Sequence, residues 1–549
     1  GTINIGTTTG NTIGATTGTN SISVTGGTNG LSIYGIRISS TGIINCNNNS
    51  IGSITGLTAS SNSTHIYGIH LSGSAVTNIE NNTIGSISTS SSINASSGSS
   101  ANAQNVYGIS SLSLGTTTIH NNTISNLKNN TSNTTVGTGG LVNGIYIEAG
   151  TNTVSKNTIR DISIANANTS ISTPSAAGVY LSVGTSTQSI SDNLIFNISN
   201  TYSSFTGNVV GLYFSNLTGS NVGDVNANFI HSISVDAAST GANIYGIYES
   251  TDKITYSNNI ISLGGSTSTT LYGMFDVGVS GKTVDLFFNS IYLSGTNSSS
   301  EKSYALRYNT NSNTRDLRNN ILFNARNGGS GSHYAIYYNA TGGTFTADYN
   351  DYYTNGTGGV IGYFGGDQNT LALLQTATSQ DVNSLNTDPN FSIAGGTNSS
   401  DYITTASIPG IAIPGTTTDY DGISRANPPK MGALEFSLGF IWQGDTSTDF
   451  GTATNWQNGA VPANGADISF AATPTNDCVL DSNRTLNSIT NTSAKKFVIN
   501  GKQFTLTGNI VEATANQIDA SATSSIVIFE GTTAQSIPSG AFVNDTFDG

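Results

Sequence analysis

Charged residues are scarce in this chain of 549 residues. Lys and Arg number 17 and Asp and Glu number 31, so 9% of the residues are charged, against roughly 25% in an ordinary soluble protein. The solvent-exposed positions of helical proteins are occupied mainly by Lys and Glu, so this scarcity of charge argues against a mostly helical fold. The net charge of −14 argues against a nucleic-acid partner, since binders of a phosphate backbone concentrate Lys and Arg.

Long apolar runs and cysteines are sparse as well. No run of about 18 apolar residues is present, so we expect no membrane span in this segment. The two cysteines, Cys46 and Cys478, lie far apart and exclude a disulfide framework. Cys46 stands among apolar strand positions and is expected to be a small core residue. The chain starts at Gly1 without a signal peptide, so we interpret it as a mature or excised segment.

What is abundant is Ser, Thr, Asn and Gly, the residues of turns and strand surfaces. Gly alone contributes 64 residues, and the apolar fraction of 36% is close to the usual value once Gly is counted with it. A lack of apolar residues is therefore no reason to expect disorder.

The chain repeats itself. One anchor is an apolar or aromatic residue followed by Gly and an aliphatic residue, as in Tyr34-Gly35-Ile36 and Tyr67-Gly68-Ile69. It recurs ten times, with central residues 27 to 40 positions apart, and Tyr304-Ala305-Leu306 is a decayed copy. Internal repeats of this length indicate a solenoid or a related repeat architecture.

A second anchor, Asn-x-aliphatic, follows the first by 12 to 17 residues in each repeat. Stacked amides can hydrogen-bond from one coil to the next, so we expect these asparagines to form a ladder along the axis. The predicted ladder residues are Asn49, Asn82, Asn122, Asn157, Asn193, Asn228, Asn258, Asn289 and Asn319, with Asn11 as an earlier copy and Asn350 as a late variant.

Strand-like alternation within each repeat, as in Ile36-Arg37-Ile38, predicts an all-β chain. A two-strand unit cannot bury its apolar face alone, so successive units must stack into a solenoid of β-coils. Each outward position then lies about 4.8 Å from its counterpart in the next coil. Like charges in such a row would repel one another, which explains the scarcity of charge.

The Tyr-Gly-Ile and Asn-Asn-Thr-Ile coils resemble right-handed parallel β-helix proteins of the pectate-lyase-like superfamily, and in particular the long secreted surface proteins of Bacteroidota. The run from Pro429 to Glu435, Pro-Lys-Met-Gly-Ala-Leu-Glu, resembles the end module of those β-helices, with Lys430 where the family usually has Asp. The resemblance implies parallel β-helix coils over 1–353 and an end and capping region over 354–436 that covers the open edge of the last coil.

A different motif follows this region. Trp442-Gln443-Gly444 and Asn455-Trp456 resemble a recurrent module start in type IX-secreted proteins, in which Trp often stands where this chain has Phe450. Short strand-like runs such as Phe497-Val498-Ile499 then predict a second, smaller β-rich and solenoid-like module over 437–549. Its end at Gly549 shows no cap, which suggests that the natural chain continues.

Because related β-helices include polysaccharide lyases and hydrolases, a catalytic site has to be considered. Arg160 and His231 occupy equivalent outward positions two coils apart, with Phe196 between them. No carboxylate pair accompanies them, Asp161 is expected to face the opposite side from Arg160, and Asp224, Asp236, Asp252 and Asp276 share no register. The five histidines show no metal-ligand spacing. We expect no catalytic residues, no metal and no cofactor.

An aromatic row follows the first anchor at the next outward position. We call its five consecutive members, Tyr146, Tyr180, Tyr213, Tyr248 and Phe275, the aromatic stripe. Stacked rings that stabilise the solenoid under partial cover of the loops are one interpretation. The alternative is an exposed contact surface for another protein or a glycan, since contiguous exposed apolar patches are rare on monomers.

The sequence thus predicts a non-enzymatic extracellular rod within a larger secreted or surface protein, such as an adhesin stalk, a surface filament or an assembly subunit. Its partners would be other copies of itself or other surface proteins, and cell-surface glycans are an alternative. The runner-up hypotheses are a carbohydrate-active β-helix that cleaves a polysaccharide and a glycan-binding module without catalysis.

Overall fold

The structure is a computed structural model. It describes residues 1–543 except 27–29, 59–61, 74–75, 98–101, 132, 134–139, 171, 183–186, 216–222, 251–252, 266–267, 279–280, 282, 310–312, 340–342, 436–439, 458–460, 513–515, 532–534 and 539. These residues fall into two compact units, 1–435 and 436–549. The predicted boundary between residues 436 and 437 lies outside the described residues.

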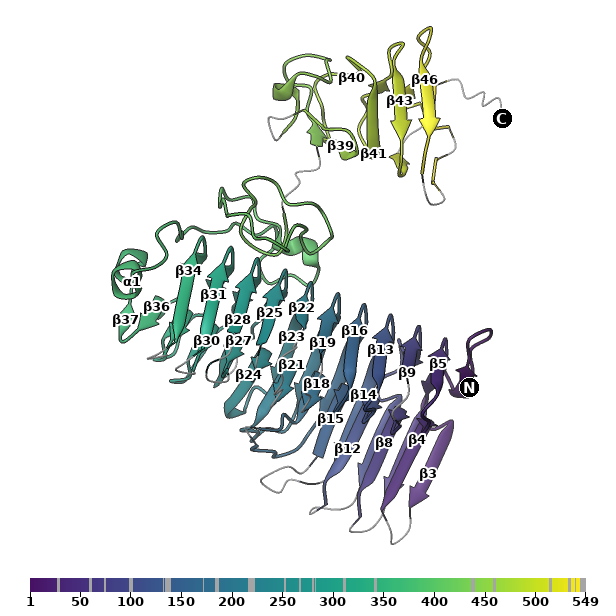
Figure 1. Cartoon of the computed structure of the whole chain (residues 1–549), viewed down its shortest axis with the longest axis vertical. Coiled ribbons are helices and arrows are strands. Elements are labelled where there is room, and N and C mark those ends of the chain that lie inside the picture. Colours follow the sequence, from purple (N-terminus) through teal and green to yellow (C-terminus); the bar gives the residue numbers. More distant parts are fainter. Residues whose placement is uncertain are drawn as a thin grey trace. The chain divides into compact units, whose positions relative to one another are not determined.

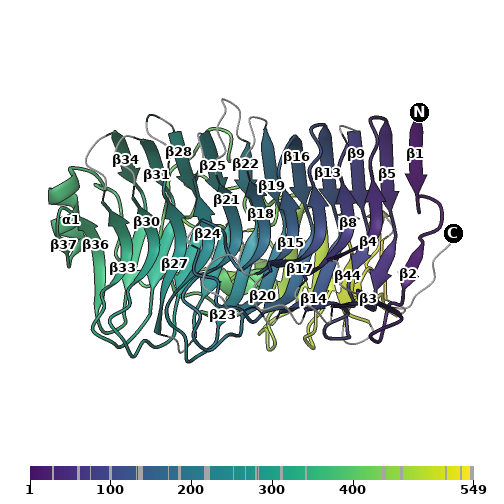
Figure 2. The same cartoon turned by 90° about the horizontal axis from the view of Figure 1, so that it is seen from below.

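The first unit is a parallel β-helix, which confirms the predicted fold class. Each coil passes in turn through three sheets, named here C, A and B, and equivalent strands of successive coils pair in parallel (Figures 1 and 2). Sheet A contains β1 (Thr2–Ile5), β5 (Ile43–Asn47), β9 (Val76–Glu80), β13 (Thr116–His120), β16 (Thr151–Ser155), β19 (Gln188–Ser191), β22 (Asp224–Asn226), β25 (Lys253–Ser257), β28 (Thr283–Phe287), β31 (Thr314–Arg318) and β34 (Thr344–Asp348).

A strand of sheet B follows each strand of sheet A after a two-residue connection, except in the first coil, where six residues separate the two strands. They are β2 (Thr12–Gly14), β3 (Ile22–Gly26), β6 (Ser50–Gly52), β7 (Ile54–Thr58), β10 (Thr83–Ile84), β11 (Ile93–Ser97), β14 (Thr123–Thr131), β17 (Thr158–Ile164), β20 (Leu194–Asn200), β23 (Phe229–Val235), β26 (Ile260–Leu263), β29 (Ser290–Leu293), β32 (Ile321–Asn324) and β35 (Asp351–Thr354).

Sheet C carries the Tyr-Gly-Ile anchors. It consists of β4 (Leu31–Ile38), β8 (Thr64–Leu71), β12 (Gln104–Ser111), β15 (Gly140–Ile147), β18 (Ala176–Ser182), β21 (Asn208–Ser215), β24 (Thr240–Glu249), β27 (Ser268–Asp276), β30 (Ser303–Tyr308), β33 (His333–Tyr338), β36 (Gly359–Phe364) and β37 (Asp367–Gln368). All its pairings are parallel except that of β36 with β37.

Aliphatic side chains from all three sheets fill the interior. In one coil, Ile109, Ile119 and Ile124 are each fully buried in the same core cluster, and Cys46 is a member as predicted. The anchor glycine is needed because the backbone approaches closely there. A Cβ at Gly68 would lie 2.4 Å from the carbonyl oxygen of Gly108 and 2.5 Å from a methyl carbon of Ile84.

An unbroken asparagine ladder runs along the corner between sheets A and B. Asn157 shows the pattern: its backbone N–H and its Nδ2 both donate to Oδ1 of Asn193, and its own Oδ1 accepts the same pair from Asn122. Its Nδ2 also donates to the carbonyl of Ile119 one coil back. Ladder members are Asn11, Asn49, Asn82, Asn122, Asn157, Asn193, Asn228, Asn259, Asn289, Asn320 and Asn350.

Two predicted ladder positions, Asn258 and Asn319, are wrong by one residue. The ladder passes through Asn259 and Asn320, while Asn258 and Asn319 take the left-handed conformation at the turn, with φ of 56° and 62°. Either asparagine of each pair fits the Asn-x-aliphatic pattern. Packing decides between them, because the register that uses Asn259 points Ile261 into the core.

The predicted end region, 354–436, divides into two parts. Helix α1 (Leu371–Thr378) lies at the end of the solenoid beside β36 (Figure 2), and its Leu374 is buried in the main core. There Ser384 takes the place of the next ladder asparagine, since its Oγ accepts from the backbone N–H of Asn350. Helix α1 and Ser384 therefore follow the last coil at this end of the solenoid.

Residues 388–435, here called the flanking segment, instead lie along the outer face of sheet B and include the 3-10 helix η1 (Ser399–Tyr402). Its Phe391, Tyr402 and Met431 share one buried cluster with outward residues of sheet B. The backbone N–H of Ala433 donates to Oγ of Ser290, and Arg425 donates to Oδ1 of Asn258. The family-like run that ends at Glu435 therefore seals a side of the solenoid.

The second unit is a smaller solenoid-like β-module, also as predicted. Its parallel strands are β38 (Phe440–Trp442), β39 (Ala466–Phe470), β40 (Cys478–Val479), β41 (Arg484–Asn491), β42 (Phe497–Val498), β43 (Gln503–Leu506), β44 (Ile510–Glu512), β45 (Ile518–Asp519) and β46 (Ile526–Phe529), with the 3-10 helix η2 (Ala453–Asn455). Aromatic rings fill its core, where Trp442 and Trp456 pack edge to face on each other and Phe450 packs on Trp456.

Candidate functional site

The aromatic stripe forms as a continuous row in sheet C. Tyr146, Tyr180 and Tyr213 pair in register on successive strands, and Tyr248 and Phe275 continue the row. Three of its five rings are buried, however: Tyr213 is 1% exposed, Tyr180 7% and Phe275 9%. Tyr146 and Tyr248 are half-buried. The hydroxyl of Tyr213 donates to the carbonyl of Ser172 in the loop that covers it. This burial favours the stacking interpretation over an open contact surface.

The stripe is part of a longer array, here called the ring chain, in which each tyrosine ring contacts the next along the solenoid. Successive ring centroids are 4.3 to 5.4 Å apart. Its members, in order, are Tyr34, Tyr67, Tyr107, Tyr146, Tyr180, Tyr213, Tyr248, Tyr245, Tyr272, Tyr304, Tyr334, Tyr337 and Tyr363. Aromatic contacts of this kind add about 0.5–1.5 kcal/mol per pair beyond the area they bury.

Arg160 and His231 do lie two coils apart with Phe196 between them. The imidazole stacks on the Phe196 ring at 4.9 Å, and the Arg160 guanidinium lies 6.0 Å from that ring's centroid. Burial lowers the pKa of His231 to about 4, so this side chain is neutral at ordinary pH. Arg160 and His231 are therefore held by ring contacts.

The expectation for Asp161 is wrong. Its carboxylate forms an ion pair with the adjacent Arg160, although neighbouring residues of a regular strand face opposite sides. The reason is a local bend: Asp161 has a φ of 56°, as do Asn126, Asn197 and Ser232 at the same place in neighbouring coils within a few degrees. A kink in this conformation breaks the alternation of side chains.

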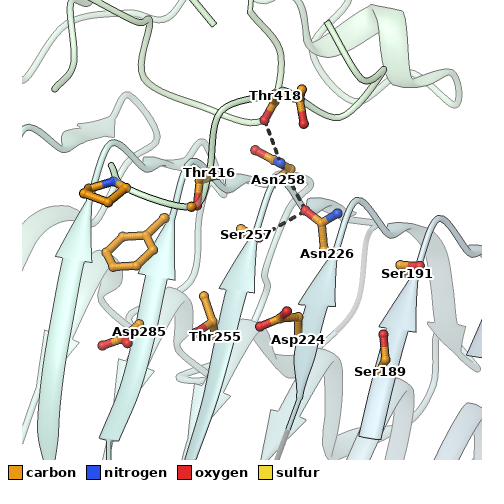
Figure 3. Close-up of a pocket in the computed structure, with 13 residues that line it drawn as sticks. Ser189, Ser191, Asp224, Asn226, Thr255, Ser257, Asn258, Asp285, Thr416 and Thr418 are labelled. Atoms are coloured by element: carbon orange, nitrogen blue, oxygen red, sulfur yellow. Dashed lines mark hydrogen bonds between the residues drawn. The ribbon is translucent and has the colours of Figure 1, made fainter. Parts of the chain in front are cut away.

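A cleft of about 580 Å³ lies over sheet A, under the loop of the flanking segment that runs from Pro414 to Thr418 (Figure 3). Four adjacent strands, β19, β22, β25 and β28, each place two side chains on its floor, at positions i and i+2. These floor residues are Ser189, Ser191, Asp224, Asn226, Thr255, Ser257, Asp285 and Phe287.

The cleft brings together carboxylates that sequence reasoning missed. Asp224 and Asp285 stand in one outward row with Thr255 between them, and Asp316 continues the row in the next coil. At about 4.8 Å per coil, the backbones of Asp224 and Asp285 are roughly 10 Å apart. The signal was available, because Asp224, Asp285 and Asp316 each precede a true ladder asparagine by four residues. The misassigned Asn319 obscured only the place of Asp316 in this row.

Hydrogen bonds hold the roof of the cleft to its floor. Nδ2 of Asn258 donates to the carbonyl of Thr418 and to Oδ1 of Asn226, which also accepts from Oγ of Ser257 (Figure 3). Further along the loop, Ile413 packs with Phe287 in a small buried cluster. The cleft is thus preformed, so binding a ligand does not require the entropic cost of ordering this loop.

The floor of the cleft carries two carboxylates. Asp224 is exposed to solvent and Asp285 is half-buried, and the described lining residues comprise no Lys or Arg. The next carboxylate of the row, Asp316, lies outside the cleft and forms an ion pair with Arg318. Hydroxyls, amides and two carboxylates facing one cavity can accept many hydrogen bonds from a polar ligand.

The described residues contain no group of three or more His, Cys, Asp and Glu side chains placed to hold a metal ion. Both cysteines are buried and unpaired, and burial raises the pKa of the Cys46 thiol to about 12. In the part of the chain that the structure describes, no helix is long and apolar enough to span a membrane. Comparisons with protein-family models, with curated proteins and with solved structures found no match to this chain.

Proposed function

We propose that this chain is a stiff, non-enzymatic structural rod within a larger extracellular surface protein, acting as an adhesin stalk, a surface filament or an assembly subunit. The observation that carries the proposal is the asparagine ladder, which runs without interruption from Asn11 to Asn350 and joins every coil to the next. Because the ladder is present in every coil, it stabilises the stacking of coils along the whole solenoid and is no local site.

The mechanism is mechanical. Backbone hydrogen bonds between coils run along the solenoid axis in three sheets around one core, so bending in any direction must stretch the bonds of at least one sheet. The ring chain adds side-chain contacts on the outside of sheet C, and the flanking segment braces sheet B. Together these features support a rod that resists bending.

The resemblance to secreted surface proteins of Bacteroidota, including the type IX-secreted module start around Trp442, supports an extracellular location. The low charge of 9% fits a surface of neutral, hydrogen-bonding rows. Other copies of the chain or other surface proteins are the partners we propose, with the loops at the edges of the coils as contact points.

Electron microscopy of the native full-length protein tests this proposal. Straight rods, alone or in bundles, are the expected result, and flexible or compact particles would contradict it. A screen against acidic and neutral polysaccharides tests the enzymatic alternative on the same material. Cleavage that is lost in Arg160→Ala or His231→Ala would replace the structural role by a carbohydrate-active one.

A further inference from the structure

The cleft over sheet A has features that the rod does not require. The stiffness of the solenoid depends on its interior ladder and its stacked rings. This cleft is instead a hollow on the outer surface, with the exposed carboxylate of Asp224 at its floor. Its volume of about 580 Å³ falls within the roughly 300–1,000 Å³ of small-molecule sites.

We propose that this cleft binds a non-acidic glycan, either neutral or amine-bearing, through hydrogen bonds to the side chains of β19, β22, β25 and β28. The binding would hold whether or not the protein forms rods. Asp224 is the main acceptor in this proposal, because it is the exposed carboxylate of the floor.

The chemistry of the floor selects this ligand class. A carboxylate with two oxygens can accept from two neighbouring hydroxyls, and hydroxyl and amide side chains such as Thr255 and Asn226 both donate and accept. Sugars present such hydroxyls on both edges of the ring. A uronic acid would place its own carboxylate beside the exposed Asp224, where like charges repel each other.

The geometry favours a chain of sugars over a single one. Polar side chains repeat along the axis at about 4.8 Å from coil to coil, and the row of the cleft continues beyond it through Thr153 and Thr118. The exposed Pro414, at one side of the cleft, offers apolar surface for the C–H face of a sugar ring.

Titration of the full chain with three defined oligosaccharides tests the proposal: cellotetraose, the tetramer of glucosamine, and trigalacturonate. The first two should bind, the glucosamine tetramer at least as tightly as cellotetraose and with affinity that falls as salt is added. Trigalacturonate should not bind. Binding of trigalacturonate alone, or of none of the three, would overturn the proposal.

Two matched variants locate the binding. Asp224→Asn keeps the size of an exposed side chain and should weaken binding about tenfold to a hundredfold, as expected when a hydrogen bond to a charged group is lost. Asp316→Asn removes a carboxylate of the same row outside the cleft and should leave the affinity unchanged. Unchanged affinity in Asp224→Asn, or an equal loss in Asp316→Asn, would show that the cleft is not the site. Circular dichroism checks that both variants fold.

Discussion

The two corners that flank sheet A hold polar groups inside the solenoid in opposite ways. At the corner with sheet B, the same amide repeats from Asn11 to Asn350. At the corner with sheet C, here called the ionic corner, residues in register change from the apolar Ile38 and Leu71 in early coils to Glu249, Asp276 and Tyr308 in later ones. Arg315 of β31 faces them and bonds to Asp276, with both side chains fully buried.

The two corners differ because amides can be stacked in a buried row and carboxylates cannot. An amide donates and accepts, so identical amides bond to one another in an endless series. A carboxylate only accepts, and a row of carboxylates inside a protein would repel itself. The ionic corner therefore stays local: the Arg315 guanidinium, 2.7 Å from Asp276 and 4.5 Å from the Tyr308 ring centroid, compensates the negative charge.

Breaking the ladder should have the largest effect. Asn157→Leu would remove the amide that the backbone N–H of Asn122 and the carbonyl of Ile119 bond to. Nδ2 of Asn122 would lose one acceptor and keep the carbonyls of Ile79 and His120. At about 1–3 kcal/mol for each buried group left unsatisfied, we expect a loss of about 4–6 kcal/mol in the free energy of unfolding, measured by urea denaturation.

The control for the ladder variant is Asn45→Thr, on the outward face of sheet A, where the half-buried Asn45 donates to Oδ1 of Asn4 and accepts from Nδ2 of Asn78. It should change stability by less than about 0.5 kcal/mol. Equal losses in the two variants would mean that the buried ladder has no special role.

Breaking the ionic corner should cost somewhat less. Arg315→Met leaves Asp276 as an uncompensated buried charge, for which a loss of about 3–5 kcal/mol is expected. The double variant Arg315→Met, Asp276→Leu should recover most of that loss, because it removes both charges. Denaturant midpoints of the two variants measure this, and a double variant as unstable as the single one would refute the compensation.

The last coil offers a test by pH. Asp351 follows the last ladder asparagine and is fully buried, and burial raises its pKa to about 7. The folded state therefore holds a proton that the unfolded state releases near pH 4, so the contribution of this group to stability falls as pH rises from about 4 to 7. Asp351→Asn should remove that slope and be more stable than the wild type at pH 8, by on the order of 1–3 kcal/mol. Parallel pH profiles of the two proteins would show the idea to be wrong.

The smallest effect concerns the outer face. Tyr213→Phe keeps the ring in the ring chain and removes its hydrogen bond to Ser172, which should cost about 0.5–1.5 kcal/mol. Thermal unfolding measures the change. The neighbouring Tyr248 is half-buried, and Tyr248→Phe should change stability by less than about 0.5 kcal/mol. If Tyr248→Phe is the more damaging of the two, the covering loop does not depend on Tyr213.

Much of the fold could be predicted because repeats carry it. The anchors around Gly68 and Asn82 recur in coil after coil, and units of this kind bury their apolar faces by stacking into a solenoid. The candidate cleft could not be predicted in the same way. Its roof, the loop around Thr416, comes from a segment more than 130 residues beyond most of its floor, and only folding brings the two together.

The ladder shows how far the sequence pattern can assign individual residues. Where two asparagines stand together, as at Asn258-Asn259, the pattern allows either register, and the packing of Ile261 chooses one. The same choice at Asn319-Asn320 decides which residues of that coil face outward, and with Asn320 in the ladder Asp316 falls in the row of Asp285. A one-residue error in register exchanges the two faces of a strand.

By itself, the sequence determined the all-β class, the coil repeat, the neutral outer rows and most of the ladder, because these depend on local residue types that recur at a steady spacing. Tertiary structure alone decided that three rings of the aromatic stripe are buried, that residues 388–435 seal the side of sheet B, and that Arg315 meets Asp276 inside the solenoid. These outcomes depend on contacts between residues far apart in the chain, where each partner's environment is created by the other, and no local pattern records that.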